Sequence, residues 1–137
     1  MSPKRTTVTK HDLLATISEA DFQDAVIQTA HLYRWKVHHT RPAMRKDGTW
    51  STPLQGDKGW PDLAMAKAWE SGKAILILAE LKAENAPAPV GDQAEWMALL
   101  GMFDGVLWLP PIWGQRQIIT RVWRPSDQRE IDALLMQ

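Results

Sequence analysis

Three charged residues beside two apolar runs give this sequence its first candidate for chemistry. Asp62 precedes one short apolar run, and Glu80 and Lys82 follow a second run at 74–79. The second run is too short to cross a membrane and is typical of a strand that is buried on both faces. If the two runs form a hairpin that turns near Ser71, Asp62 and Glu80 lie opposite each other. Glu80 and Lys82 are two residues apart, so they face the same side of a strand.

Two carboxylates and an ammonium group at one point suit a hard divalent cation. Oxygen ligands without thiols or a His pair favour Mg²⁺ or Mn²⁺ over Zn²⁺. Such an ion activates a water and neutralises the charge that builds on a phosphodiester, while Lys82 orients the water or stabilises the transition state. His38 and His39 face opposite sides of a strand and are not expected to be ligands. The alternative is a solvent-facing hairpin end with a Glu80–Lys82 surface pair, and these three residues alone favour that alternative.

Length and composition limit the classes of protein to consider. The chain has 137 residues, enough for one domain with a hydrophobic core, and its 45% hydrophobic and 23% charged residues are typical of a globular protein. No apolar stretch approaches the roughly 20 residues of a membrane helix, and the N-terminus lacks a signal-peptide core. The absence of cysteine fits a cytoplasmic protein. Sixteen basic residues balance sixteen acidic ones, so nucleic-acid binding would have to come from a local patch.

The apolar periodicity predicts an α/β fold in which helices flank a central mixed β-sheet. Residues 1–17 are expected to form a basic N-terminal arm, as a solvated tail or a phosphate contact, and residues 18–137 to form a single domain. The predicted elements are a helix from Ser18, strands at 35–40, 63–66 and 74–79, a helix at 92–100, strands at 106–109 and 118–123, and a helix from Asp127.

Two further groups of residues are candidates for the site. Glu19 and Gln23 are one helical turn apart and can point at the same place, although Glu19 can equally serve to complement the helix dipole. The long loop at 43–58 leads into the Asp62 corner, and basic residues in and beside it are candidates for contact with a phosphate backbone. These candidates are Arg41, Arg45, Lys46 and Lys58. Trp50 and Trp60 either stack on bases or pack under the loop.

Taken in order, these segments resemble the virus-type replication-repair nucleases (VRR-NUC), a branch of the PD-(D/E)XK restriction-endonuclease-like superfamily. Residues 59–62 are similar to the family's Gly-x-Pro-Asp corner, and residues 80–82 to its Glu-x-Lys strand. Each motif alone is weakly specific, but the order of the motifs is fairly specific. The similarity covers roughly residues 18–134, and the other matching residues are Ser18, Glu19, Phe22, Gln23, Trp35, Gln93, Trp96, Leu100, Gly105 and Val106. The longer loop at 43–58 and a Pro-rich stretch at 109–117 depart from the short phage-type members.

The resemblance implies a restriction-endonuclease-like core and a Mg²⁺- or Mn²⁺-dependent DNA endonuclease acting on branched DNA such as four-way (Holliday) junctions. It also implies a role for each matching polar residue: Asp62 and Glu80 as metal ligands together with the Leu81 backbone carbonyl, Lys82 as the catalytic lysine, Glu19 as an auxiliary acid near the metal, and Gln93 as a polar group beside the site. If the chain is phage-encoded, it is expected to act in the cytoplasm of the host cell.

Two other functions and one assembly state complete the expectations. A nicking or flap nuclease, and a non-catalytic DNA-binding protein that kept the nuclease fold, remain alternatives to junction cleavage. A homodimer is expected because paired cuts in a four-way junction need two active sites. The candidates for the dimer interface are apolar residues near the C-terminus: Trp108, Leu109, Ile112, Trp113, Leu134, Leu135 and Met136. Ordinary core packing is the alternative role for each of them.

Overall fold

The fold is an α/β layer built on a five-stranded mixed sheet with the strand order β1-β4-β5-β7-β6. The structure, a computed structural model, describes residues 7–40, 43–44, 46–51, 56–109 and 114–137. Strands β5 and β7 are parallel, and the other neighbouring pairs are antiparallel. The strands are β1 (Lys36–His39), β4 (Leu63–Ala68), β5 (Ala74–Leu81), β6 (Gly105–Leu109) and β7 (Gly114–Trp123). The predicted α/β class with a mixed sheet is therefore confirmed.

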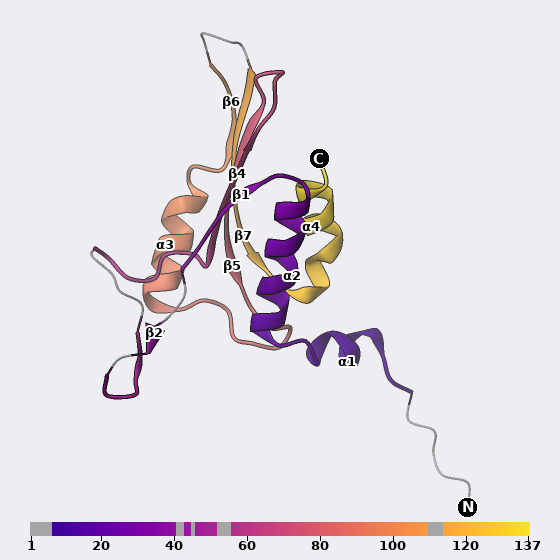
Figure 1. Cartoon of the computed structure of the whole chain (residues 1–137), viewed down its shortest axis with the longest axis vertical. Helices are drawn as coiled ribbons and strands as arrows, with labels where there is room; N and C mark the ends of the chain where they lie inside the picture. The colour runs from indigo at the N-terminus through magenta and orange to yellow at the C-terminus, as the bar shows by residue number, and fades with distance from the viewer. Residues whose placement is uncertain (1–6, 41–42, 45, 52–55, 110–113) are drawn as a thin grey trace, which may run out of the picture.

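Helices cover the two faces of the sheet unequally. Helices α2 (Glu19–Leu32) and α4 (Gln128–Leu135) lie on one face, and α3 (Gly91–Gly101) lies on the other (Figure 1). The α3 helix covers only the part of the sheet near the end of β5, and the strands extend beyond it. The N-terminus of α2 lies at that same end of the sheet.

Strand β5 is central because its side chains alternate between two packed faces. Ile75, Ile77, Ala79 and Leu81 belong to the hydrophobic core, which also contains residues of α2 and α4. The opposite face of β5 carries Glu80, which is buried as well. Glu80, a candidate site residue, thus lies on the strand of the sheet with the most buried side chains among the described residues.

Three parts of the chain differ from the sequence-based expectation. The segment predicted as an arm contains a short helix, α1 (Lys10–Ala15), which Thr9 and Asp12 cap reciprocally. It is six residues long and buries no side chain, so it lacks the apolar stripe by which helices are recognised. The loop at 43–58 contains a small antiparallel ribbon, β2 (Ala43–Met44) with β3 (Trp50–Ser51). Strand β7 begins at Gly114 and not at residue 118 as predicted. A Cβ at Gly114 would lie 2.2 Å from the Gly72 carbonyl oxygen.

The C-terminal helix closes the core. Leu135 is fully buried, and its carbonyl accepts a hydrogen bond of 2.9 Å from the Trp35 indole N–H. Leu134 is partly buried against the same core, so it and Leu135 do not offer the free interface surface that was expected of them. A 3₁₀ turn, η1 (Pro125–Asp127), leads into α4. Within the described residues, no helix has the length and apolar character to cross a bilayer.

Truncation of Leu135 tests this packing. Leu135→Ala should lower the free energy of unfolding by about 2–5 kcal/mol, because it leaves a cavity in a closed core. Met136→Ala is the matched control: Met136 is 48% exposed, so the loss should stay within about 0.5 kcal/mol. Urea denaturation measures both values, and similar losses for the two variants would contradict the packing described here.

Candidate active site

The register of the β4–β5 hairpin brings two carboxylates together. Leu63 pairs with Ala79 at the end of the ladder, so one further step sets Asp62 opposite Glu80. The hairpin expected from the sequence is therefore confirmed, including its register. The Asp62 backbone N–H donates a hydrogen bond of 3.3 Å to Glu80 Oε2, and the Leu81 N–H donates one of 2.8 Å to Asp62 Oδ2. These two bonds fix each carboxylate against the neighbouring strand.

Lys82 and Gln93 complete a cluster around the Glu80 carboxylate. The Gln93 side-chain amide donates a hydrogen bond of 2.9 Å to Glu80 Oε1, and its own oxygen accepts one of 3.2 Å from Lys82 Nζ. Lys82 Nζ also lies 3.7 Å from Glu80 Oε1. Gln93 thus bridges the acid and the base, and it reaches them from α3.

Burial separates this cluster from an ordinary surface ion pair. The side chain of Glu80 is 2% exposed and that of Lys82 is 17% exposed. A solvent-facing hairpin end with a Glu80–Lys82 surface pair, which was the alternative interpretation, is therefore wrong. Charged groups are rarely buried unless they are paired, so this arrangement requires its partners.

The protonation of Glu80 follows from its surroundings. Burial, helped by repulsion from the Asp62 carboxylate, raises the pKa of Glu80 from 4.5 to about 7, and the Lys82 ammonium opposes this rise. Two neighbouring carboxylates cannot both be charged at low cost without a compensating cation. The site is therefore electrostatically suited to a positive charge beyond that of Lys82.

The donor set fits a hard divalent cation held with water. Asp62 and Glu80 could supply carboxylate oxygens to such an ion, and Leu81, directly between Glu80 and Lys82, could supply its backbone carbonyl. Among the residues that the structure describes, no group of three His, Cys, Asp or Glu side chains could hold a metal ion. Mg²⁺ commonly binds through one or two carboxylates and keeps several waters, so a pair is enough for it, whereas a zinc site would need more ligands.

Glu19 is not joined to the cluster by any direct contact in the described part of the chain. It is exposed in the first turn of α2, whose N-cap is Ser18. The turn lies at the end of the sheet where β5 ends. The position of Glu19 in the first turn fits the helix-dipole role at least as well as the role of an auxiliary acid.

The expected DNA-contacting residues have different surroundings. Lys46 is exposed in the turn between β2 and β3. Lys58 is 80% exposed and forms an ion pair of 3.5 Å with Asp92. Trp60 is 40% exposed and meets the Trp96 ring edge-on, with 5.1 Å between ring centroids. The described residues do not include the predicted DNA contacts Arg41 and Arg45 or the interface candidates Ile112 and Trp113. The side chains of Trp50, Trp108 and Leu109 also lie outside the described part of the structure.

Two close contacts hold the Asp62 corner against α3. Gly59 has φ +99°, and a Cβ at this position would lie 2.6 Å from the Asp92 carbonyl carbon, so only glycine fits. The Trp96 indole N–H donates a hydrogen bond of 3.0 Å to the Lys58 carbonyl. These contacts align the corner that carries Asp62 with the helix that carries Gln93.

Arg124 supports the connector beside the cluster, and no motif in the sequence singles it out. It follows β7, and its guanidinium Nη1 donates to the carbonyls of Ala83, Glu84 and Ala86 at 2.8, 3.3 and 2.8 Å. These carbonyls belong to the connector from β5 to α3, so Arg124 fixes the path between Lys82 and Gln93. The contact spans about forty residues along the chain, and no local pattern announces it.

Comparisons with protein-family models, curated proteins and solved structures found no match to this chain.

The raised pKa of Glu80 makes the stability of the metal-free protein depend on pH. Because the folded pKa exceeds the unfolded value, the stability that Glu80 contributes is complete below about pH 4.5 and is lost as pH rises through about 7. With a chelator present, raising the pH from about 5 to about 8 should lower the free energy of unfolding of the wild type by about 2–3 kcal/mol more than that of Glu80→Gln. Urea denaturation across this range measures the difference. Exposed Glu70→Gln should keep the wild-type slope, and equal slopes for all three proteins would refute the shift.

Proposed function

We propose that this chain is a Mg²⁺- or Mn²⁺-dependent DNA endonuclease of the VRR-NUC type, with a restriction-endonuclease-like core. The proposal rests chiefly on one observation: Asp62 and Lys82 meet around the buried Glu80 at the end of the β4–β5 hairpin. Retaining a buried acid beside a second acid without a compensating cation lowers stability, and a catalytic role gives a reason to keep it. The sequence resemblance points to the same three residues.

Asp62, Glu80 and the Leu81 carbonyl would hold the divalent ion. When bound, the ion would lower the pKa of a water molecule and offset negative charge on the phosphodiester. Its positive charge would also favour the ionised form of Glu80 at neutral pH. The protein's part is to supply these oxygens in a fixed arrangement, which the hydrogen bonds from the Asp62 and Leu81 N–H groups maintain.

Lys82 would act on the reacting phosphate and its nucleophile. Its ammonium group is held beside the acids by Gln93 Oε1 and Glu80 Oε1, and it is still 17% exposed. From this position it can donate a hydrogen bond to the attacking water or to a phosphoryl oxygen, where negative charge grows in the transition state. Gln93 would keep both Glu80 and Lys82 oriented, and Glu19 would be an auxiliary acid.

The proposed substrate is branched DNA, with four-way junctions first. Exposed Lys46 and Lys58, and Arg41 and Arg45 beside them in sequence, would contact the phosphate backbone next to the Asp62 corner. The same chemistry would serve nicking or flap cleavage, so the DNA structure has to be varied in the assay. We also propose that the protein acts in the cytoplasm.

Cleavage of linear, flap and four-way DNA tests this function. Activity should require Mg²⁺ or Mn²⁺, vanish with chelation, and be lost in Asp62→Ala and Glu80→Ala, whereas Ca²⁺ should allow binding with little cleavage. Lys82→Ala should lower kcat by about 10²–10³-fold with nearly unchanged DNA affinity. Lys46→Ala is the contrasting variant, which should weaken binding and reduce its salt slope by about 1. Strong cleavage by either carboxylate variant would rule out the proposed metal site, and binding of DNA without cleavage would indicate the non-catalytic alternative.

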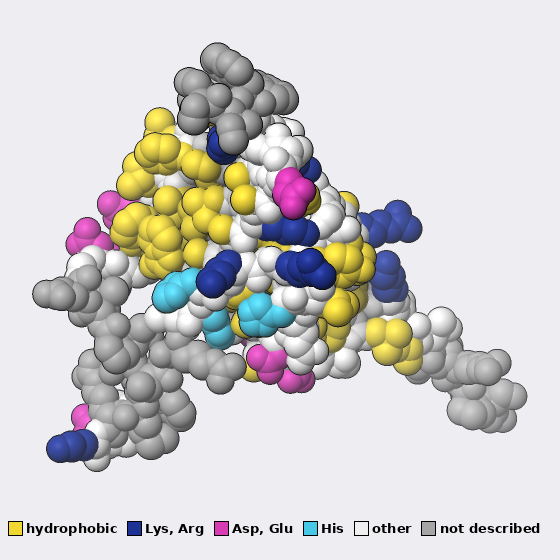
Figure 2. All heavy atoms as spheres, turned by 45° about the horizontal axis from the view of Figure 1, so that its top comes forward, with side chains coloured by type: hydrophobic (Ala, Val, Ile, Leu, Met, Phe, Trp, Pro, Cys, Tyr) yellow, Lys and Arg dark blue, Asp and Glu magenta, His cyan; other side chains and the backbone are white. Residues whose placement is uncertain are grey.

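A two-fold homodimer is part of the proposal, because paired incisions need two sites. Exposed apolar side chains lie at the end of α3 and on β6, and Figure 2 shows hydrophobic side chains gathered on that side of the molecule. They include Met102, Phe103, Val106 and Leu107, and these replace the buried Leu135 and the partly buried Leu134 among the interface candidates.

Light scattering at micromolar concentration should therefore report twice the mass of one chain. Leu107→Asp should give a monomer, because it places a charge in the apolar surface, while Leu32→Asp, on the exposed side of α2, should stay dimeric. A wild-type monomer that makes paired, symmetric cuts would refute the dimer. A wild-type monomer that only nicks would favour the nicking alternative.

A further inference from the structure

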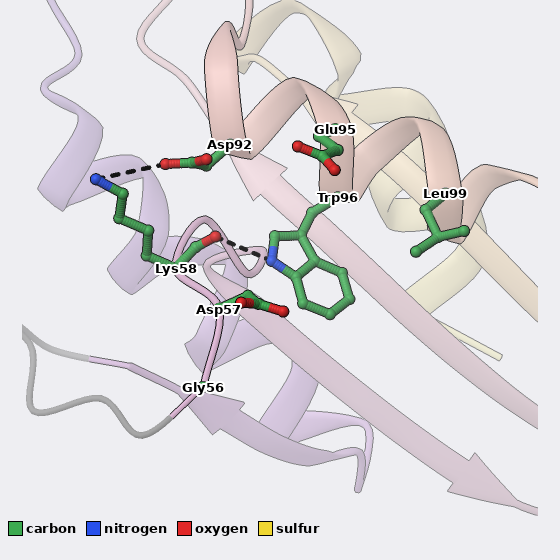
Figure 3. A pocket seen from close by; sticks show the side chains of 7 residues that line it. All are labelled: Gly56, Asp57, Lys58, Asp92, Glu95, Trp96 and Leu99. Atoms are coloured by element: carbon green, nitrogen blue, oxygen red, sulfur yellow. Dashed lines mark hydrogen bonds and ion pairs between the residues drawn. The ribbon is translucent and has the colours of Figure 1, made fainter.

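A pocket beside the catalytic cluster has no role in the chemistry described so far. It has a volume of about 550 Å³ and lies between residues 56–58 and one face of α3 (Figure 3). Sites for small organic groups usually measure about 300–1,000 Å³. The pocket and the cluster are carried by neighbouring parts of the same segments: residues 56–58 continue into the Asp62 corner, and α3 carries Gln93 one turn before Trp96.

The lining combines apolar surface with carboxylate hydrogen-bond acceptors. Trp96 and Leu99 project from α3 and supply the apolar surface. Glu95, from the same helix, and Asp57, on the opposite wall, supply carboxylates. Within the described residues, neither carboxylate has a hydrogen bond or an ion pair. The pocket can therefore hold a flat apolar group that carries hydrogen-bond donors at its edge.

Charge decides which part of a nucleic acid suits this pocket. Lys58 and Asp92 pair with each other at 3.5 Å and lie to one side of the Trp96 ring (Figure 3). Their charges largely cancel inside the pocket, so Asp57 and Glu95 leave it acidic, while the Lys58 ammonium, which is 80% exposed, can still meet a phosphate outside it. A phosphate group would be repelled there, whereas an uncharged base with amino hydrogens would be attracted.

We infer that this pocket accepts the base of an unpaired nucleotide that carries an exocyclic amino group, next to the phosphate held at the catalytic cluster. The inference rests on the proposed nuclease function and specifies its substrate. The base stacks against Trp96, and its amino group donates to Asp57 or Glu95. Thymine is disfavoured, because it presents a carbonyl oxygen where cytosine presents the amino group. The edge-on contact with Trp60 keeps the Trp96 ring in position.

Duplex DNA with one bulged nucleotide tests the inference. Binding is measured by fluorescence anisotropy in Ca²⁺, with cytosine, thymine or an abasic site at the bulge. The wild type should bind the cytosine bulge about tenfold more tightly than the abasic bulge, because one stacked base is lost. It should bind the cytosine bulge about fivefold more tightly than the thymine bulge, because a hydrogen bond to a carboxylate is lost.

Two variants assign the preference to the pocket. Asp57→Asn with Glu95→Gln should bring the cytosine-to-thymine ratio close to one, and Glu70→Gln, an exposed acid in the β4–β5 turn, should leave it unchanged. The ratio is used because removing any acid strengthens DNA binding in general. Equal affinity for all three bulges, with metal-dependent cleavage intact, would overturn the inference and leave the nuclease standing. Cleavage of no DNA, in the presence of Mg²⁺ or Mn²⁺, would overturn the nuclease itself.

Discussion

The burial of the Glu80 carboxylate opposite Asp62 is the constraint on which the rest of the site depends. A buried acid beside a second acid is unfavourable, and that cost is visible in the pKa of Glu80, which rises from 4.5 to about 7. The nearby groups compensate in part: Gln93 donates to one oxygen, the Asp62 N–H to the other, and Lys82 brings a positive charge. The compensation is incomplete, which is what a site for a cation requires.

Several unrelated contacts keep these compensating groups in place. Gly59 permits the Asp62 corner to touch α3, and Trp96 ties the same corner to the helix through the Lys58 carbonyl. Arg124 fixes the connector on the other side of the cluster. Each contact joins segments far apart in sequence, so a geometric error in any one would move Gln93 relative to Glu80. Such supporting contacts determine whether reacting groups are held closely enough for catalysis.

The two sides of the sheet serve different purposes. The side under α2 and α4 is a closed apolar core that includes Trp123 and Ile131. The side under α3 is only partly covered, and it carries the acid cluster, the neighbouring pocket and the exposed apolar surface. The face under α2 and α4 therefore provides the stability that allows the face under α3 to keep a buried charge and exposed apolar side chains. This division is consistent with a protein that binds a large ligand on one side.

The sequence by itself determined the α/β class, the β4–β5 hairpin and its register. Short apolar runs and a Ser-Gly turn between them are local signals, and the equal spacing about Ser71 placed Asp62 opposite Glu80 without knowledge of the fold. The sequence could not reveal α1, because its helix is held by a capping box and not by an apolar stripe. It missed the β2–β3 ribbon for a similar reason, since each of its strands has only two residues.

Only the tertiary structure decided that Glu80 is buried and that Lys82 is nearly so. Without the fold, these residues alone favoured a solvated surface pair, because burial depends on what packs above a strand. That covering is made by α3, which begins eleven residues after Glu80 on a path set by Arg124. The same approach of α3 to the hairpin produces the hydrogen bonds of Gln93 and Trp96 and leaves no room for a side chain at Gly59. It also forms one wall of the acidic pocket. Contacts between distant segments have no local signature, and this is why the pairing of Asp62 with Glu80 could be predicted from the sequence but its environment could not.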